Sequence, residues 1–369
     1  MKIGILTIVD YDNYGNRLQN YALQEVLKKL GHDVITVKNF HETKKPFLKR
    51  IFKLFIPSKV LNKIQENIVN KARYHEIDAE RVNSFKKFTD KYIDENEIPI
   101  YDVSDDFSEL EDCDCFVIGS DQVWNYNFPR FSFIDFAGFT NKPKFSYAAS
   151  FGVNEIPNNL KKMYEKGLKQ LESISVREDV GKKIVEELTN RKSTVVLDPT
   201  LLLDREQWLT LIKGRTIYSE KYVVTYFLSK PNKKVVKYIN TYAYKNNLEI
   251  KNLATRKDVK LWVANPADFV NLLYQAENVF TDSFHACVFS IIFKKNFEVF
   301  ERNGTNGSMN SRIETLLNKF NLDSRWHHNG NTPNDSIDYS LINSLLCKER
   351  KSSIDFLEDS LNIVENKKI

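Results

Sequence analysis

Apolar runs alternate with segments of helical period from the start of the chain. A strand is predicted from Ile3 to Val9, and after a polar turn the apolar spacing predicts a helix from Arg17 to Leu30. Gly31 is a residue type that commonly ends a helix, and a second strand is predicted from Asp33 to Val37. Two strands joined by a helix form a βαβ unit, so a parallel sheet is expected.

Four further strands of the N-terminal half end in polar or small residues. They are predicted at 116–118, 145–149, 174–176 and 194–197, with a helix at 180–188. Arg177 and Asp198 directly follow two of these strands. In open parallel sheets the loops at the carboxyl ends of the strands line the ligand-binding crevice. We therefore expect a binding site at this edge of the sheet.

A second alternating series begins at Tyr222. Strands are predicted at 222–228 and 248–254, and helices at 233–245 and 266–276. Residues 259–263 take the place of the next strand in this alternation. Strand signals lapse between Leu203 and Lys221, which places a domain boundary there. The pattern predicts an α/β protein with two Rossmann-like, doubly wound domains that face each other across a cleft, the GT-B-like layout.

The domain organisation follows from these series. The N-terminal Rossmann-like domain is predicted to cover 1–205, with a basic helical insertion at about 44–110. The C-terminal Rossmann-like domain is predicted to cover 215–335, and a tail at 337–369 has the pattern of one or two amphipathic helices. A chain of 369 residues fits two domains of ordinary size.

Positive charge is concentrated in one segment of the insertion. Residues 44–73 contain nine basic side chains and one acid, Glu66, whereas the whole chain carries a net charge of +5. Because this charge is local, a nucleic-acid partner is not expected. Apolar residues at 46–55 lie among the basic ones, which fits peripheral contact with an anionic membrane. The alternative is a helix packed on its own domain with its lysines outward.

The remaining composition narrows the class of protein. No apolar run reaches the roughly 20 residues needed to cross a bilayer, and the N-terminus has the pattern of a strand rather than a signal peptide. Cys113 and Cys115 are two apart, which suits neither a metal site nor a disulfide. We expect no metal and no bound cofactor. We also expect a cytoplasmic protein that contacts the inner face of the membrane peripherally.

The most informative stretch, 277–300, has the pattern strand, turn, helix, strand. Asp282 and Ser283 are N-cap residue types after the strand, and His285 falls in the first helical turn. The following helix is apolar on most faces, so it should be buried. Free N–H groups and the helix dipole favour an anion at this turn, where a histidine binds the anion, donates a proton, or does both. The alternative is a core histidine capped by a neighbour.

Three arginines fall where cleft residues are expected. Arg177 closes a strand, and its planar fork suits a carboxylate or a phosphate. The alternative for Arg177 is a salt bridge with one of the two acids that follow it. Arg302 follows the last predicted strand and precedes a loop rich in Asn and Gly, and Arg312 begins the next helix. We expect these side chains to contact an anionic ligand.

Two loops of the N-terminal half carry groups suited to a sugar or an anion. The turn after the first strand contains Asn13, Gly15 and Asn16, whose spacing is not the dinucleotide fingerprint. The loop after the strand at 116–118 offers a hydroxyl, a carboxylate, amides and an indole expected to be exposed, as carbohydrate sites do; its residues are Ser120, Asp121, Gln122, Trp124 and Asn125. For the indole, the alternative is a buried residue that covers the sheet.

Six segments in this order resemble the polysaccharide pyruvyl transferase family. They are YGNRLQNYALQ (14–24), GSDQVWN (119–125), SYAASFG (146–152), SISVRED (173–179), VVLDPTLLL (195–203) and TDSFHACVFS (281–290). The resemblance runs from Lys2 to about Phe320, and the basic insertion matches only in character. It implies a GT-B-like fold and transfer of a pyruvyl group from phosphoenolpyruvate to hydroxyls of a cell-surface glycan or its lipid-linked precursor, forming a ketal.

The resemblance also implies residue roles. The family's SVR arginine matches Arg177 and its histidine matches His285, and both are implied to contact phosphoenolpyruvate, which places the donor mainly on the C-terminal domain and the acceptor on the N-terminal one. A further basic residue of the family matches Arg302 only loosely. We add Asp121 or Asp282 as a base toward the sugar and His285 as a proton donor. The predicted partners are phosphoenolpyruvate and a sugar or glycolipid acceptor.

Two other functions compete with this one. A GT-B glycosyltransferase would use a nucleotide sugar, and the second domain lacks a distinctive acid pair for its ribose. A non-catalytic glycan-binding protein is compatible with the same fold. The presence of both Arg177 and His285 at matching positions argues against a protein that has lost its active site.

Overall fold

The computed structural model describes residues 1–39, 58–103, 105–128, 131–302, 310–327 and 336–367, with the backbone alone for 58–73. Residues 44–57 of the predicted basic segment 44–73 therefore lie outside the described residues. The same holds for most of the loop after Arg302.

The first sheet contains six strands, all parallel, in the order β2-β1-β3-β4-β5-β6. Their bounds are β1 (Lys2–Leu6), β2 (Asp33–Thr36), β3 (Cys115–Ile118), β4 (Lys144–Ala149), β5 (Ile174–Val176) and β6 (Thr194–Val195). Every residue of β3, β4 and β5 is buried. Continuous burial is what a parallel sheet covered by helices on both faces requires.

The second sheet contains four parallel strands in the order β10-β9-β7-β8. Their bounds are β7 (Tyr222–Tyr226), β8 (Glu249–Asn252), β9 (Asn278–Thr281) and β10 (Asn296–Val299). β7 and β9 are buried throughout, whereas the edge strand β8 is largely exposed. Two parallel α/β sheets confirm the predicted fold class.

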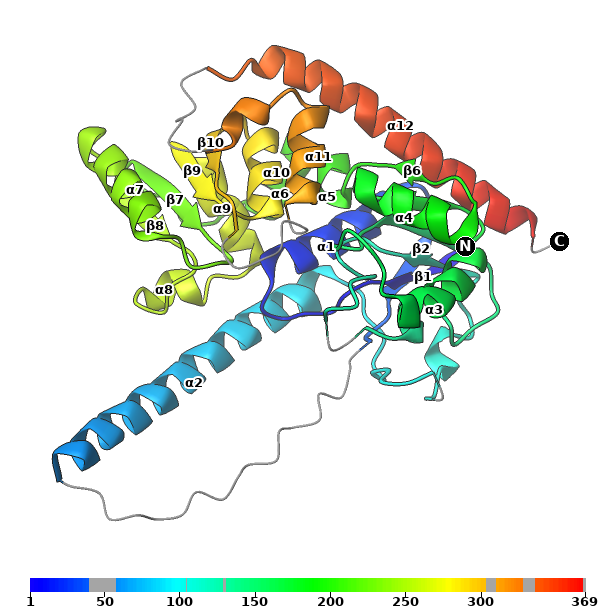
Figure 1. Ribbon diagram of the computed structural model, residues 1–369, viewed down its shortest axis with the longest axis horizontal. Helices are drawn as coiled ribbons and strands as arrows, with labels where there is room; N and C mark the ends of the chain where they lie inside the picture. Colours follow the sequence, from blue (N-terminus) through cyan, green and yellow to red (C-terminus); the bar gives the residue numbers. More distant parts are fainter. Residues whose placement is uncertain (40–57, 104, 129–130, 303–309, 328–335, 368–369) are drawn as a thin grey trace.

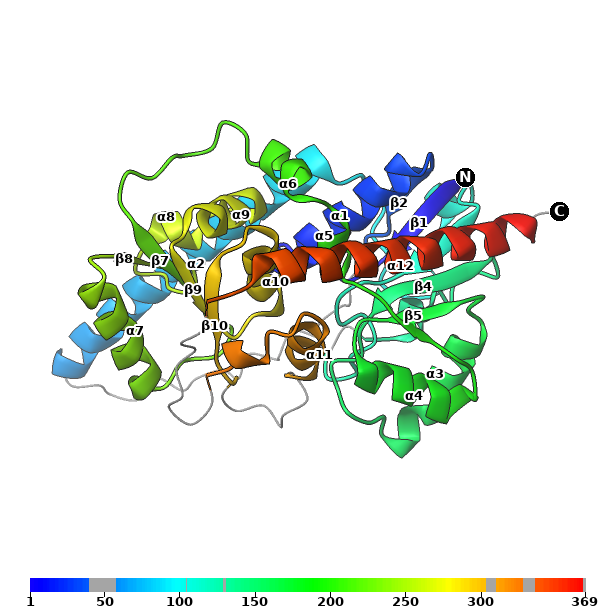
Figure 2. The same ribbon diagram turned by 90° about the horizontal axis from the view of Figure 1, so that it is seen from above.

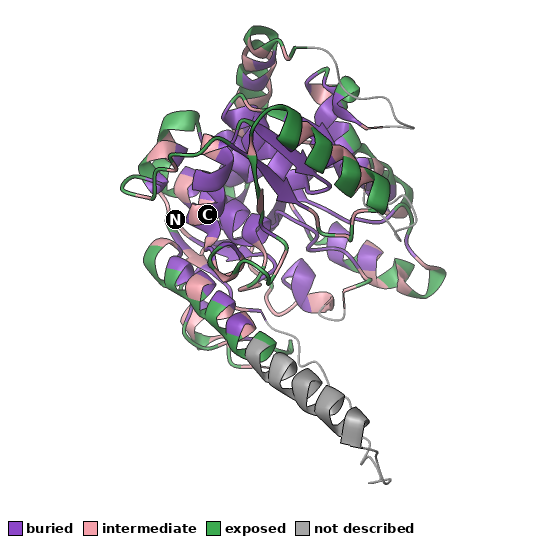
Figure 3. Ribbon diagram, turned by 90° about the vertical axis from the view of Figure 1, so that its left-hand side faces the viewer, coloured by how far each residue is buried: buried purple, intermediate pink, exposed green. Residues whose placement is uncertain are grey.

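The helices cover both faces of the two sheets (Figure 1). Their bounds are α1 (Tyr14–Lys29), α2 (Ser58–Tyr92), α3 (Asn158–Lys169), α4 (Asp179–Thr189), α5 (Pro199–Leu202), α6 (Arg205–Leu211), α7 (Lys233–Lys245), α8 (Val259–Trp262), α9 (Pro266–Gln275), α10 (Phe284–Ile292), α11 (Ser311–Lys319) and α12 (Tyr339–Asn366). The described residues also include the short 3₁₀ helices η1 (Ser108–Leu110), η2 (Phe133–Phe136) and η3 (Asp323–Arg325). In Figure 3 the central strands are buried and the outer faces of the helices carry the exposed residues.

One predicted element is wrong. Residues 259–263 were expected in a strand position, but the structure has the short helix α8 there. Asp258 caps this helix, because its carboxylate accepts a hydrogen bond from the backbone N–H of Leu261. Local capping therefore overrides the strand-like alternation of apolar residues at this place.

The insertion contributes one long helix. α2 has 35 residues and projects from the body of the protein, and only its C-terminal part packs on the two domains (Figure 1). Phe85 and Phe88 are buried there, and Arg81 is 4% exposed. The Arg81 guanidinium donates to the Asp12 side chain and to the Trp262 carbonyl, so this end of α2 connects the two domains.

The C-terminal tail is a single helix that lies across both domains (Figure 2). At its start the Tyr339 hydroxyl donates to the Lys295 carbonyl in the second domain. Further along, the Ser353 hydroxyl accepts from the Leu197 N–H in the first domain. α12 therefore connects the two sheets on the face opposite to α2.

The apolar core runs without interruption between the two sheets. It includes residues of β1 and α1 on one side and of α9 and α10 on the other. Tyr14 of α1 stacks on Phe269 of α9 with ring centroids 4.5 Å apart. This shared core fixes the first turns of α1 and α10 relative to each other.

Each sheet reverses its strand order at one point. The reversal lies between β1 and β3 in the first sheet and between β7 and β9 in the second. Ligands of open α/β sheets bind outside the carboxyl ends of the strands at such points. The loops that follow these four strands hold Asp10, Asp121, Leu228 and Asp282.

Candidate functional site

His285 occupies the first turn of α10, as the sequence predicts. Its side chain is almost fully buried, and Ser283 sits at the N-cap position without a side-chain capping bond. Gly15, in the first turn of α1, packs directly on the imidazole ring: a Cβ at this glycine would lie 1.9 Å from Nδ1 of His285. The amino ends of one helix from each domain therefore meet at this histidine.

Asp198 joins the two most important predicted residues. Its Oδ2 lies 2.6 Å from Nη1 of Arg177 and 3.7 Å from Nε2 of His285. The Ser120 hydroxyl also donates to this oxygen, at 3.1 Å. Burial alone would raise the pKa of Asp198, but His285 and Arg177 outweigh it and hold that pKa well below its usual range. Asp198 is therefore an anion that orients both Arg177 and His285.

A second buried carboxylate, that of Asp121, also pairs with the Arg177 guanidinium. Oδ1 of Asp121 lies 3.2 Å from Nη2 of Arg177 and 3.8 Å from Nη1 of Arg312. Burial raises the pKa of Asp121, but the positive charges of Arg177, His285 and Arg312 lower it overall. Burial and the neighbouring charge of Arg177 lower the pKa of Arg312 to about 9. An Asp121 so strongly held as an anion is a weak base.

Arg302 reaches the same region from the end of β10. Its Nη2 donates to the Asp282 carbonyl at 3.2 Å, and its Nε lies 3.8 Å from the Asp282 carboxylate. That carboxylate accepts hydrogen bonds from the N–H groups of Leu228 and Ser229 and from the Ser229 hydroxyl. Asp282 thus connects the loops after β7 and β9 at the reversal point of the second sheet.

Asp121, Arg177, Asp198, His285 and Arg312 form a charged cluster, which Arg302 approaches from the second sheet. Its buried nitrogens include two that have no hydrogen-bond acceptor among the described residues. Within the described part of the chain, neither Nε2 of His285 nor Nε of Arg177 makes a hydrogen bond. The Arg177 guanidinium also lies over the ring of Phe284, 4.5 Å from its centroid. A buried donor without a partner costs stability, and Nε of Arg177 is such a donor, whereas Nε2 of His285 faces Asp198 at 3.7 Å.

The indole of the GSDQVWN loop does not face solvent, which corrects the sequence expectation. Trp124 is fully buried, its Nε1–H donates to the Asp135 carbonyl at 3.0 Å, and its ring stacks on Phe136. Gln122 and Asn125 are buried as well and bond to each other. These three side chains hold the loop in shape, because the chain after residue 131 covers them.

The turn after β1 contains a buried structural residue, Asn16, and a residue that lines a cavity, Asn13. Asn16 is buried and its side chain accepts from the Asp10 N–H and from Nε of Arg17. Asn13 caps α1 and also lines a cavity of about 330 Å³ between the domains. Of the predicted substrate-binding residues on the N-terminal side, Asn13 is thus one that faces an open space.

Residues that sequence reasoning missed are equally informative. The sequence places Asp198 directly after a strand, and a carboxylate followed by proline at that place is a signal that could identify it as a site residue. The predicted alternative for Arg177, a salt bridge with an adjacent acid, is wrong for Glu178. The Glu178 carboxylate instead accepts from the Ser150 hydroxyl and the Phe151 N–H.

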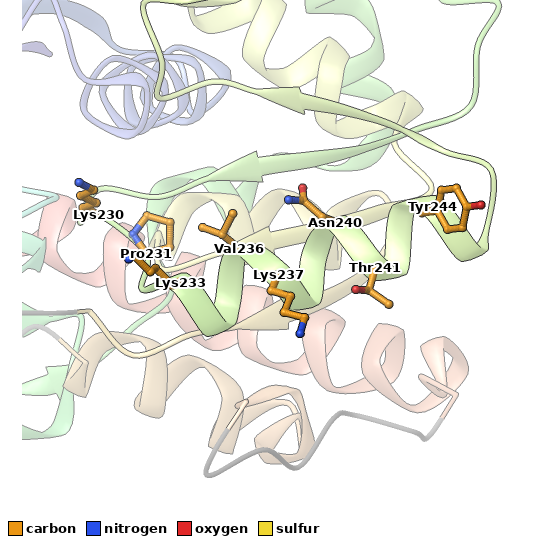
Figure 4. Close-up of a pocket in the computed structure, with 8 residues that line it drawn as sticks. All are labelled: Lys230, Pro231, Lys233, Val236, Lys237, Asn240, Thr241 and Tyr244. Carbon is orange, nitrogen blue, oxygen red and sulfur yellow. The ribbon is translucent and has the colours of Figure 1, made fainter.

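Another hollow lies on the outer face of α7. Figure 4 shows Lys233, Val236 and Tyr244 along this helix, around an open depression that Lys230 and Lys237 also line. None of the cluster residues lines it. This surface is therefore not part of the charged cluster.

Among the described residues, no helix is both long and apolar enough to span a membrane. In the same part of the chain, no group of three or more His, Cys, Asp or Glu residues is arranged to hold a metal ion.

Several solved structures are similar to this chain. They include the UDP-GlcNAc 2-epimerase from Neisseria meningitidis (12% identity, TM-score 0.47, covering 99% of this chain and 94% of that one) and a glycosyltransferase from Rickettsia africae (14%, 0.43, 99% and 96%). The UDP-N-acetylglucosamine 2-epimerase from Rickettsia bellii is a third (11%, 0.44, 97% and 98%). A comparison with curated proteins found no match.

The family comparison covers most of the chain. The family described as polysaccharide pyruvyl transferase matches residues 13–303. This range includes Arg177, Asp198 and His285 and every strand of the two sheets except β1. The chain therefore belongs to the polysaccharide pyruvyl transferase family.

Proposed function

We propose that the protein transfers the pyruvyl group of phosphoenolpyruvate to two hydroxyls of a cell-surface polysaccharide or of its lipid-linked precursor. The product is a pyruvate ketal, and inorganic phosphate is released. Family membership supports the reaction class. The observation that carries the proposal is the meeting of Arg177 and His285, from different domains, on the same oxygen of Asp198.

The donor presents two anionic groups close together. A carboxylate and a phosphate in one small site require at least two cationic groups, and a planar guanidinium suits either anion. The cluster supplies Arg177, Arg302 and Arg312 together with His285, at the carboxyl ends of strands from both sheets. The free N–H groups at the amino end of α10 add a partial positive charge beside His285.

The carboxylates of the cluster limit how tightly the donor binds. Asp121 and Asp198 already neutralise part of the positive charge around Arg177. They fix the direction of the guanidinium and leave its Nε without a hydrogen-bond partner among the described residues. A side chain that is already held in its binding orientation loses little conformational entropy when phosphoenolpyruvate binds. Groups held in this way stabilise the transition state through their fixed orientation, rather than by binding phosphoenolpyruvate as tightly as possible.

The proposed chemistry balances with the groups present. A proton adds to the methylene carbon of phosphoenolpyruvate, and the adjacent carbon becomes electron-poor. One sugar hydroxyl bonds to that carbon and gives up its proton, and a second hydroxyl replaces the phosphate, which leaves as hydrogen phosphate. Protonated His285 supplies a proton and neutralises the phosphate. No water is consumed, so exclusion of water from the buried cluster protects the reaction from hydrolysis.

A direct test uses isotope transfer. Phosphoenolpyruvate labelled with ¹³C at carbon 2 is incubated with the protein and with an envelope polysaccharide extract from the producing cells. The proposal predicts a new ¹³C ketal signal in the polymer fraction and one equivalent of inorganic phosphate by ³¹P NMR. Label that stays in phosphoenolpyruvate, or appears only as free pyruvate, contradicts the proposal. Transfer from UDP-GlcNAc in a parallel sample would favour the glycosyltransferase instead.

The location and the membrane contact are part of the same proposal. A lipid-linked acceptor would be reached at the inner face of the membrane, and the basic segment 44–73 has the charge to contact that surface. Residues 44–57 lie outside the described structure, so this contact stays a prediction. Vesicles with and without anionic lipid test it by sedimentation of the full chain.

A further inference from the structure

A cavity of about 330 Å³ opens between the two domains beside the first turn of α1. Asp10, Asp12 and Asn13 line it from the loop after β1, and Arg81 lines it from α2. Leu228 and Trp262 are among the residues that close it from the second domain. Its volume falls at the lower end of the roughly 300 to 1,000 Å³ of small-ligand sites, which fits about one sugar ring.

The cavity adjoins the charged cluster through two of its walls. Asn13 caps α1, and two residues later Gly15 packs on the ring of His285. On the other side, the N–H of Leu228 donates to Oδ1 of Asp282 at 2.6 Å. A ligand in the cavity therefore lies next to the elements that hold His285 and Asp282.

The walls of the cavity are already fixed. The Arg81 guanidinium donates to Asp12 Oδ1 at 3.0 Å and to the Tyr14 hydroxyl at 3.0 Å. It also stacks on the rings of Tyr14 and Trp262, 4.7 Å from each centroid. The indole N–H of Trp262 donates to Asp78 at 3.0 Å. A cavity with ordered walls loses little entropy when a ligand enters it.

The chemistry of the lining favours a neutral ligand rich in hydroxyls. Asp10 and Asp12 supply carboxylate oxygens, and Asn13 supplies an amide group. The positive charge of Arg81 is engaged by Asp12, so the cavity does not attract a second phosphate or carboxylate. Hydroxyl groups that donate to carboxylates match this lining, as they do in carbohydrate sites.

We propose that this cavity is the acceptor subsite, which holds the sugar ring that receives the pyruvyl group, with Asp10 as the carboxylate that takes the proton of the attacking hydroxyl. In that step the O–H bond breaks, its proton goes to Asp10, and its electron pair forms the new bond from oxygen to the pyruvyl carbon. The inference rests on the proposed function for the identity of the donor.

Asp10 suits this role better than the other carboxylates nearby. Burial and the negative charge of Asp12 raise the pKa of Asp10, so it is a stronger base than an ordinary carboxylate. Asp12 forms an ion pair with Arg81 and has two-thirds of its side chain exposed. Asp121 is held as an anion by Arg177, and the Asp282 carboxylate accepts three hydrogen bonds.

The test measures binding before turnover. Saturation-transfer difference NMR is recorded on the full protein with three probes, methyl β-D-galactopyranoside, methyl β-D-glucopyranoside and methyl 2-acetamido-2-deoxy-β-D-mannopyranoside, in the presence of phosphoenolpyruvate. We expect saturation transfer to at least one glycoside. Absence of transfer to all three overturns the proposal.

Variants then locate the bound glycoside. Ala254 is exposed and lines the cavity, so Ala254→Trp fills it without disturbing the core and should abolish the transfer. Asp106→Asn is the control, because Asp106 lines a separate cavity of about 370 Å³ in the N-terminal domain and should leave the transfer unchanged. Equal transfer in wild type and Ala254→Trp overturns the subsite.

Release of phosphate separates this inference from the proposed function. With the glycoside that binds, Asp10→Asn should lower phosphate release by at least about 100-fold, while its affinity for phosphoenolpyruvate stays within about threefold of wild type. A wild-type rate in Asp10→Asn overturns the proton role. If the wild type binds both phosphoenolpyruvate and the glycoside but releases no phosphate, the acceptor assignment fails. If the wild type does not bind phosphoenolpyruvate, the proposed function fails instead.

Discussion

The contact between Gly15 and His285 offers a sharp test of the site. In Gly15→Ala the added Cβ would lie 1.9 Å from Nδ1 of His285, whereas ordinary contacts begin at 3.4 Å, so the ring must retreat by about 1.5 Å. Asp198 lies 3.7 Å from the far side of the ring, and Phe284 packs on it edge to face. The imidazole therefore cannot keep its position when this methyl group is added.

The size of the effect follows from the displacement. A hydrogen bond to a charged ligand weakens steeply over such a distance, and losing one costs about 1.5–3 kcal/mol. This corresponds to phosphoenolpyruvate binding that is roughly 10- to 150-fold weaker. Overpacking a buried contact also destabilises the fold by about 1–3 kcal/mol, partly offset because alanine favours a helix more than glycine does.

Calorimetric titration with phosphoenolpyruvate and urea unfolding measure the two effects separately. Gly181→Ala is the matched control, because Gly181 lies in the first turn of α4 and its added Cβ would come no closer than 3.2 Å to Phe151. The control should bind phosphoenolpyruvate as the wild type does. If Gly15→Ala binds with wild-type affinity, His285 is not held against Gly15 when the donor is bound, and the reasoning is refuted.

Two further predictions concern the buried carboxylates. Asp198→Asn leaves the buried Arg177 short of one anion, so the free energy of unfolding in urea should fall by about 3–5 kcal/mol at pH 7. Because the pKa of Asp198 is lowered in the folded protein, this difference should shrink as the pH falls below about 4. Glu298 behaves in the opposite way, because burial raises its pKa from 4.5 to about 7, so its ionisation costs stability as the pH rises from about 4.5 to about 7. Glu298→Gln should remove that loss, on the order of 3 kcal/mol, and a variant with the wild-type pH profile would contradict it.

Local patterns in the sequence predicted the elements around the site well. The strand, turn and helix around His285 form within a few residues of each other, so their order follows from spacing and cap residue types. Arg177 was likewise placed correctly at the end of a strand. Its ion-pair partners were not, because Asp121 and Asp198 are separated from it by many residues and become its neighbours only through the strand order.

Burial was harder to predict than position. Trp124 lies in the expected loop, but its exposure depends on Phe136 and Tyr164, which cover it from later parts of the chain. The helix α8 was missed because one capping side chain, that of Asp258, outweighs an alternating pattern. The cavity beside Asp10 had no sequence signal, since its walls come from the loop after β1, from α2 and from the second domain.

Calorimetry of phosphoenolpyruvate binding tests the central claim most directly. The wild-type protein and His285→Ala are titrated at two salt concentrations, and Arg256→Ala, which removes an exposed guanidinium paired with Asp78, serves as the control. The account predicts saturable binding that weakens with salt in the wild type and the control, and at least about tenfold weaker binding in His285→Ala. Equal binding by the wild type and His285→Ala, or no binding by the wild type, would contradict the assignment of the donor to this site.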